Sequence, residues 1–186
     1  MFILDPKDEV PKIFHSDLTG APICACALCN TELTEDVDYM VEKAFKKAGT
    51  AVVHTSFECI PVMQARMSEE SKKNITEFFE SKINLEKRFK EKIEEHQFEI
   101  DKWLNHCVVT NKSIDNIQEY QVYGQFKGNR LVYGLFPYTI SGEVLDQIIH
   151  LISAKSLDEM NGFKDQIITP DPTLKELFPT RPPILI

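Results

Sequence analysis

Four side chains in the first third of the chain, Cys26, Cys29, His54 and Cys59, have the chemistry and the spacing of a metal site. Thiolates and neutral imidazoles are ligands that Zn²⁺ prefers, and structural sites commonly combine four of them. A Cys-x-x-Cys turn places two sulfur atoms about one edge of a tetrahedron apart. The later pair follows after a gap long enough for a hairpin. We therefore predict a zinc site of three thiolates and one imidazole.

The fourth ligand of this site is open between two residues. His54 and Cys59 have four residues between them, and Cys24, which lies two residues before Cys26, is the alternative to His54. A Cys-x-x-Cys pair without later partners could instead be a redox pair or two buried thiols. No βαβ pattern surrounds this pair, and that argues against thioredoxin-type chemistry.

The predicted zinc is structural. A catalytic zinc keeps an open coordination position and usually has a carboxylate base nearby. Three thiolates and an imidazole leave no such position. The sequence also lacks the His-x-Glu signature of nucleobase deaminases and the His-Glu-x-x-His signature of zinc proteases. We predict no catalytic residues, and we expect the protein not to be an enzyme.

The remaining candidates for chemistry have simpler interpretations. Neighbouring residues on a strand point to opposite faces, so His106 and Cys107 would not pair, and a buried thiol is predicted. His96 lies on the apolar face of a predicted helix and is expected to pack there. Six Tyr and Phe residues between 120 and 138 could stack on bases, but core packing is favoured.

Composition limits the classes of partner. The 186 residues include 42% hydrophobic side chains and carry a net charge of -8, which counts against unspecific binding to nucleic acid. The best basic patch, residues 82–90, is interrupted by Glu86 and flanked by Glu80 and Glu91, so a solvated helix face is favoured. Three of the five cysteines crowd into six residues, a pattern that favours metal over disulfides in a reducing cytoplasm. No apolar stretch is long enough to cross a membrane.

The candidate ligands must be positioned by a small module at residues 23–67. Residues 39–45 and 51–54 have strand character and are separated by a turn candidate at 46–50. A helix is predicted from near Ser56 to about Met67, with Pro61 tolerated in its first turn.

Residues 68–105 have helical periodicity throughout. Ser68 is the predicted N-cap, and the series Phe89, Ile93, His96, Ile100 and Trp103 advances in steps of four and three, as one helix face requires. The pattern predicts one long helix or two consecutive ones. Such a rod needs a surface to cover its apolar face, either from residues 106–186 or from another chain.

Residues 106–186 are predicted to begin with strands and end in helices. Residues 119–126 and 130–136 flank Lys127-Gly128-Asn129 and predict a β-hairpin. Residues 142–154 have the spacing of an amphipathic helix. Ser156 and Glu159 have the spacing of a capping box for a second helix that would run to about residue 165. A Pro-rich tail follows from residue 170.

A Cys-x-x-Cys turn, then a hairpin, then a His54/Cys59 pair leading into a helix resembles the treble-clef group of zinc fingers, which includes LIM-like and RING-like modules. The resemblance covers residues 24–67. Those modules mostly space the last two ligands by two residues, whereas this chain has four residues between them. The resemblance implies a small hairpin-and-helix unit held by one structural zinc.

The sequence therefore predicts an α+β protein with three segments. They are a zinc module with an irregular N-terminal arm at 1–67, a helical connector at 68–105, and a hairpin with helices at 106–186. The expected function is a cytoplasmic regulatory or assembly factor that binds a protein partner, or another copy of itself, through the long helix. The alternative is a nucleic-acid-binding regulator that uses the zinc module or the basic helix face.

Overall fold

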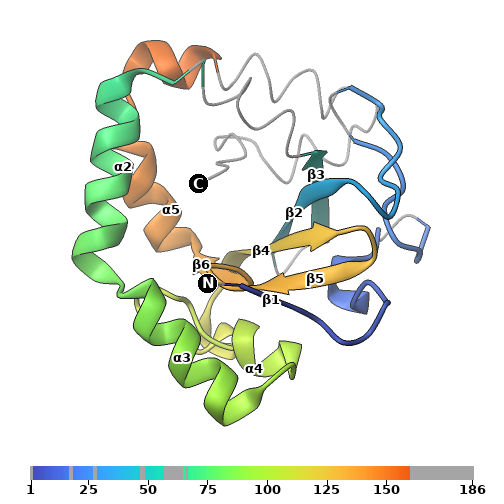
Figure 1. Cartoon of the computed structure of the whole chain (residues 1–186). Coiled ribbons are helices and arrows are strands. Elements are labelled where there is room, and N and C mark those ends of the chain that lie inside the picture. Colours follow the sequence, from blue (N-terminus) through green and yellow to red (C-terminus); the bar gives the residue numbers. More distant parts are fainter. Residues whose placement is uncertain are drawn as a thin grey trace.

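The computed structural model describes residues 2–16, 19–26, 29–46, 65 and 67–159, together with the backbone of 49–56. These residues form helices and an antiparallel sheet, which confirms the α+β class (Figure 1). The strands are β1 Ile3–Leu4, β2 Asp38–Lys46, β3 Gly49–Ser56, β4 Glu119–Lys127, β5 Arg130–Tyr133 and β6 Tyr138–Ser141. The helices are α2 Glu69–Lys82, α3 Leu85–His96, α4 Ile100–Leu104 and α5 Gly142–Ile149, with short 3-10 helices at Lys12–Phe14 and Ile114–Asn116. A further helical segment covers residues 154–159.

The sheet joins strands that are far apart in the sequence. Its order is β1-β5-β4-β2-β3, and β6 also pairs with β4. At its centre β2 is antiparallel to β4, and the register runs without interruption from Asp38 opposite Lys127 to Lys46 opposite Glu119. The sheet therefore combines strands from residues 1–67 with strands from residues 106–186.

Both predicted hairpins are present. β2 continues into β3, and β4 continues into β5 through a turn at Gly128, whose φ of +56° favours glycine. A Cβ atom on Gly128 would also lie 2.7 Å from the backbone of Glu35. The second strand of this hairpin ends at Tyr133, three residues earlier than predicted, and the chain re-enters the sheet as β6.

The two faces of the sheet are covered by different helices. Because side chains alternate along a strand, Met40 of β2 enters one core while Tyr39 and Val41 enter the other. The α2–α5 core contains Met40, Ile75, Phe79, Cys107, Tyr123, Phe136, Tyr138, Ile140, Val144, Leu145, Ile148 and Ile152. The α3–α4 core contains Val10, Phe14, Tyr39, Val41, Phe89, Trp103, Leu104, Val122, Phe126, Leu131 and Tyr133. The predicted packing of the aromatic residues of the hairpin is thus confirmed for those in the two cores.

The prediction of one or two helices over residues 68–105 was wrong, because the chain forms three. Asn84 ends the run after α2, since its side chain accepts a hydrogen bond of 2.8 Å from the backbone of Lys87 and caps α3. Gln97 ends α3 with a φ of +48°, and its carbonyl accepts a hydrogen bond of 2.9 Å from the indole of Trp103. These two breaks bend the chain around the sheet.

The bends let the helices share their apolar residues between both cores. Ile75 and Phe79 of α2 enter the α2–α5 core, whereas Phe89 of α3 and Trp103 of α4 enter the α3–α4 core. Of the two expected covers for these helices, residues 106–186 or another chain, residues 106–186 thus supply much of the packing surface. His96 is half-buried near Glu95 at the end of α3. None of the helices in the described part of the chain is long and apolar enough to cross a bilayer.

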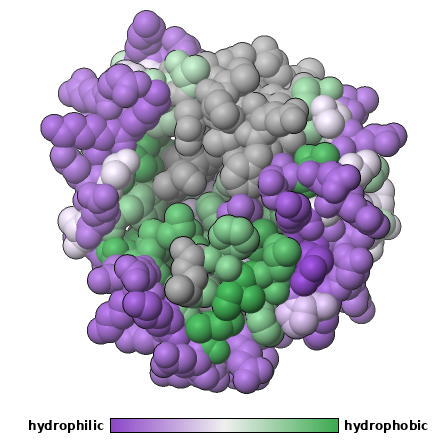
Figure 2. Space-filling model, in the orientation of Figure 1, coloured by the Kyte–Doolittle hydropathy of each residue, from purple (hydrophilic) through white to green (hydrophobic). Residues whose placement is uncertain are grey.

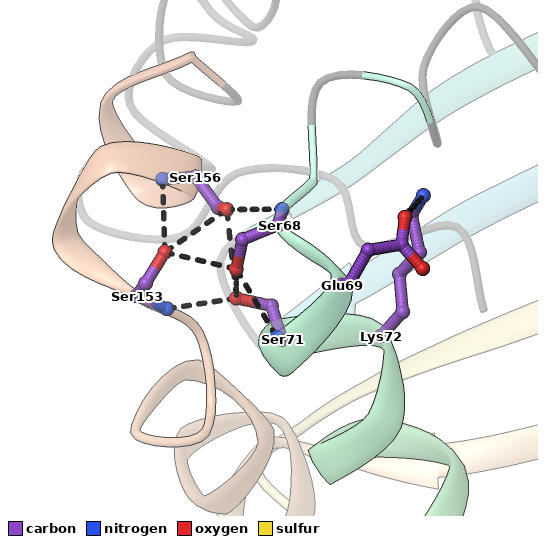
Figure 3. A network of polar contacts seen from close by, with 6 residues as sticks. All are labelled: Ser68, Glu69, Ser71, Lys72, Ser153 and Ser156. Atoms are coloured by element: carbon purple, nitrogen blue, oxygen red, sulfur yellow. Dashed lines mark hydrogen bonds and ion pairs between the residues drawn. The ribbon is translucent and has the colours of Figure 1, made fainter.

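Four serines fasten the start of α2 to the chain after α5 (Figure 3). Ser68 is the N-cap of α2, as predicted, and accepts a hydrogen bond of 3.1 Å from the backbone of Ser71. The Ser71 hydroxyl in turn accepts a bond of 3.0 Å from the backbone of Ser153. The backbone of Ser68 donates to the Ser156 hydroxyl at 2.8 Å.

This network corrects the predicted capping box. The backbone of Ser156 donates to the Ser153 hydroxyl at 3.3 Å, so Ser153 caps the helical segment 154–159 and Ser156 lies inside it. The helix predicted over residues 142–154 ends at Ile149. The helix predicted from near Ser56, the end of the helix expected to reach residue 165 and the Pro-rich tail lie wholly or mostly outside the described residues.

Replacing Ser71 with alanine tests the network. Ser71 is fully buried, so the variant leaves the backbone N–H of Ser153 without its acceptor. We expect Ser71→Ala to lower the free energy of unfolding by about 1–3 kcal/mol, measured by urea denaturation. Ser81→Ala is the control, since the Ser81 hydroxyl bonds the Phe78 carbonyl on an exposed face. Equal effects of the two variants would contradict this role.

Candidate metal centre

The first two predicted ligands lie on a tight turn formed by residues 24–33. The backbone N–H of Cys26 donates to the carbonyl of Thr31 at 2.8 Å, and the N–H of Leu33 donates to the carbonyl of Cys24 at 2.9 Å. Ala25 and Glu32 form a β-bridge between these two bonds. The turn is therefore a miniature hairpin that holds the Cys-x-x-Cys sequence at its tip.

Asn30 closes the turn in a left-handed conformation. Its φ is +57°, which asparagine tolerates better than most residues, and its N–H donates to the carbonyl of Cys26 at 3.0 Å. The Cys26 side chain is buried and that of Cys29 is exposed. The Cys29 sulfur lies 3.0 Å from the Thr31 hydroxyl. The turn brings both cysteines onto one short segment, as a pair of zinc ligands requires.

The other predicted ligands are only partly described. The backbone of His54 is in β3, opposite Val41 of β2, but its side chain and all of Cys59 lie outside the described residues. Cys24, the alternative ligand, is exposed. Within the part of the chain that the structure describes, no three His, Cys, Asp or Glu side chains gather as a metal site. The complete ligand set thus stays a prediction.

No family model, no curated protein and no solved structure matches this chain. The chemistry of its sites must therefore be judged from its own side chains. Two further groups, one around Cys107 and one around Glu42, have unusual surroundings.

The thiol of Cys107 is buried and hydrogen-bonded, which confirms the prediction of a buried cysteine. It lies 3.3 Å from the backbone nitrogen of Ser141, which donates to it, and 3.5 Å from the hydroxyl of Ser141. Burial alone raises the pKa of this thiol, but hydrogen bonds from Ser141 and Thr110 outweigh burial, so its pKa lies below the ordinary value. The ring of His106 lies instead 2.8 Å from the side-chain oxygen of Asn105.

Glu42 is a buried carboxyl that sequence reasoning did not single out. It lies on β2 between Met40 and Ala44, and only 1% of its surface is exposed. Among the described residues neither of its carboxylate oxygens has a hydrogen-bond partner. Burial raises its pKa well above the ordinary value of 4.5. Its burial could have been predicted from its position in the strand. Because side chains alternate, residue 42 lies on the same face as Met40, and that face is a core face.

Two buried tyrosines interact electrostatically with this carboxyl. Tyr123 is directly opposite Glu42 in the sheet, and Tyr138 is opposite Tyr123 on β6. Burial and the charge of Glu42 both raise the pKa values of these tyrosines. The Tyr123 hydroxyl donates a bond of 2.6 Å to the side chain of Gln121. The whole group is therefore expected to be uncharged in the folded protein.

Glu42 should make stability depend on pH. The folded state holds the proton of Glu42 more tightly than the unfolded state, so stability is highest below the unfolded pKa and falls as pH rises toward the folded pKa. We expect Glu42→Gln to remove this fall, so that its stability relative to wild type increases as the pH rises above the ordinary pKa of 4.5, measured by urea denaturation. Glu94→Gln, at an exposed position, is the control. Parallel pH profiles for wild type and Glu42→Gln would contradict the assignment.

Proposed function

We propose that this chain is a non-enzymatic zinc-binding protein, in which Cys26, Cys29, His54 and Cys59 hold a structural metal ion and the folded surface binds another protein. The observation that carries the proposal is the turn at residues 24–33. Its backbone hydrogen bonds and the left-handed Asn30 present two cysteines from one short loop. Such a loop supplies half of a tetrahedral thiolate site.

The hydrogen bonds of the reactive side chains argue against a catalytic role. The Cys107 thiol accepts a hydrogen bond from the backbone of Ser141, the N-cap of α5, and donates one to the Ser141 hydroxyl, while the His106 ring contacts the side chain of Asn105. A nucleophile and its base would need to lie within hydrogen-bond reach of each other. A binding role therefore accounts better than catalysis for the side chains that the structure describes.

An apolar groove beside α2 supports a protein partner. It has a volume of about 510 Å³, and its walls come from α2, the α2–α3 connection and the loop before β6. The lining residues are Ile75, Thr76, Phe79, Glu80, Ile83, Asn84, Leu85, Val108, Leu135, Phe136 and Tyr138. Leu135 is 57% exposed at this groove. Figure 2 shows hydrophobic side chains gathered in the lower half of one face of the molecule, with hydrophilic ones to the left, to the right and below them.

The expected occupant is an apolar segment of a protein. Among the described residues that line the groove, Glu80 is the one acidic residue and none is basic. These walls therefore favour burial of hydrocarbon over charge pairing. The predicted role of the helical connector is thereby refined. The apolar residues of the connector are divided between the two cores and the groove. Those of α2 that line the groove are the ones that another chain could contact.

The alternative of nucleic-acid binding draws on a second, polar groove. This groove is lined by Lys82, Lys87, Arg88 and Lys92, but also by Glu91 and Glu95, among other residues. Arg88 is committed to the fold: it donates to the carbonyl of Pro137 at 2.9 Å and lies over the Trp103 ring, and burial lowers its pKa to about 10. Mixed charge at this groove favours the protein partner over a phosphate backbone.

Metal analysis tests the zinc. We expect about one equivalent of zinc in the purified protein, and loss of both metal and folding in Cys29→Ser and Cys59→Ser, measured by mass spectrometry and circular dichroism. His54→Ala should lose metal if the imidazole is the fourth ligand, whereas Cys24→Ser is the matched control and should keep it. A protein that is fully stable without metal would contradict the proposal.

Peptide selection tests the groove. We expect peptides selected from a random display library on the wild-type protein to be rich in Leu, Ile and Phe, because the groove walls are apolar. Leu135→Asp should weaken binding of a selected peptide about tenfold or more in fluorescence anisotropy, a loss of about 1.4 kcal/mol. Asn129→Asp adds the same charge at an exposed hairpin position and should change nothing. Two results would contradict the role of the groove in binding protein. One is unchanged peptide binding by Leu135→Asp, and the other is salt-dependent retention of RNA or DNA without peptide binding.

A further inference from the structure

The turn at residues 24–33 has a counterpart at residues 105–114. In the second turn the N–H of Cys107 donates to the carbonyl of Lys112 at 2.9 Å, and the N–H of Ile114 donates to the carbonyl of Asn105 at 3.0 Å. The corresponding bonds of the first turn join residues 26 with 31 and 24 with 33. Every residue of the second turn thus lies 81 positions after its equivalent.

The details of the two turns also agree. Asn111 has a φ of +55° and donates to the carbonyl of Cys107 at 2.8 Å, as Asn30 does to Cys26. A β-bridge joins residues 106 and 113, the equivalents of the bridged residues 25 and 32. The cysteine and the left-handed asparagine are therefore retained at matching positions, while Thr110 stands where the first turn has Cys29.

The strands that follow the two turns continue the same offset. β2 covers residues 38–46 and β4 covers residues 119–127, so each residue of β4 again lies 81 positions after its equivalent. Four of the nine equivalent positions carry the same residue type. These identical pairs are Tyr39 and Tyr120, Val41 and Val122, Phe45 and Phe126, and Lys46 and Lys127.

The two equivalent strands pair with each other about an approximate two-fold axis. Glu42 is opposite Tyr123, its own equivalent, so the axis passes through this pair. A two-fold axis requires each contact to occur twice with the partners exchanged. The ring of Tyr39 stacks on that of Phe126 at 5.2 Å and 15°. The ring of Phe45 correspondingly stacks on that of Tyr120 at 4.8 Å and 11°.

The second hairpin strand extends the correspondence toward the helix. Lys46 pairs with Gly49 in the first hairpin, as Lys127 pairs with Arg130 in the second. Tyr39 pairs with Ser56, and its equivalent Tyr120 pairs with Ser141, the N-cap of α5. The offset is 85 at this end because the second copy has four extra residues between β5 and β6. With this offset, Cys59 corresponds to Val144.

We infer that residues 24–56 and 105–141 are two copies of one turn and hairpin module, and that the second copy corresponds to a metal site that has lost three of its four ligands. The duplication stands on the backbone and the sequence, whereas reading the second site as a lost zinc site rests on the proposed function of the first. In the second copy Cys107 remains, Thr110 and Thr139 stand at the positions of Cys29 and His54, and the offset of 85 in the sequence gives Val144 at the position of Cys59.

Hydrogen bonds hold the second copy together where the metal would. The Cys107 sulfur, the retained ligand position, lies 3.5 Å from the Ser141 hydroxyl. Two sulfurs on one tetrahedral zinc lie about 3.8 Å apart, since each Zn–S bond is about 2.3 Å. The Ser141 hydroxyl therefore lies about as far from the Cys107 sulfur as a second ligand of the same zinc ion would, although Ser141 is the equivalent of Ser56 and the equivalent of His54 is Thr139. The α2–α5 core, which includes both Cys107 and Val144, surrounds this position with apolar side chains.

Restoring ligands to the second copy tests the inference. The triple variant has cysteines at positions 110 and 144, the equivalents of Cys29 and Cys59, and at position 141, whose side chain lies beside the Cys107 sulfur. Thr110→Cys, Ser141→Cys and Val144→Cys would join Cys107 in a set of four thiolates with two residues between the members of each pair. We expect it to bind about one more equivalent of zinc than wild type and to give the cobalt absorption bands of a tetrahedral thiolate site. The matched control, Thr110→Ser, Ser141→Ala and Val144→Ala, should gain none. A folded triple variant with the metal content of wild type would overturn the inference.

A second variant keeps the inference testable if the triple variant does not fold. Cys107→Ser should keep the same zinc content as wild type, because the second copy holds no metal. Loss of zinc from a folded Cys107→Ser protein would overturn the inference. The two proposals can fail separately. A wild-type protein without zinc would contradict the proposed function. The gain of one equivalent of zinc by the triple variant tests the second copy alone.

Discussion

The antiparallel pairing of β2 with β4 is the interaction on which the rest of the structure depends. It joins a strand from the cysteine-rich N-terminal part to a strand from the C-terminal hairpin over nine residue pairs. Because side chains alternate across these strands, the pairing also decides which residues enter the α2–α5 core and which enter the α3–α4 core. The helices α2 to α5 lie beside the sheet that contains this central pair of strands (Figure 1).

The same pairing buries an ionisable group at its centre, which is unfavourable for folding. A two-fold axis places one residue opposite its own equivalent, and here that position holds Glu42 in one copy and Tyr123 in the other. The Glu42 carboxyl is buried, and it has no hydrogen-bond partner among the described residues. Burial of this kind makes the charged form of a carboxyl unfavourable. Tyrosine, which is neutral, suits the same environment better. The two copies have thus diverged in electrostatics at the axis while keeping the stacked aromatic pairs on both sides of it.

Much of the fold could be predicted from the sequence because its signals are local. Alternating strands, the Lys127-Gly128-Asn129 turn and the Ser68 cap each depend on a few neighbouring residues. The break at Gln97 could not be predicted in this way, because its left-handed conformation accompanies a hydrogen bond from Trp103 six residues later. The choice of Ser153 over Ser156 as a cap likewise depends on a contact with α2.

The candidate site shows the same division between local and distant signals. Cys26 and Cys29 could be found from their spacing, and a turn that suits two ligands is present. The relation between this turn and the one at Cys107 was missed, since few identities link the two copies and a threonine replaces the second cysteine. Hydrogen-bond patterns retain the relation more clearly than residue types do, because backbone geometry tolerates many side chains.

The most direct test of two copies with one metal is a crystal structure with diffraction data collected at the zinc absorption edge. The account predicts one anomalous peak, bound by Cys26, Cys29 and residues of the 54–59 segment, and none beside Cys107. It also predicts that the backbone of residues 24–46 superposes on that of residues 105–127. A zinc peak at Cys107, or no peak at the first turn, would contradict the account.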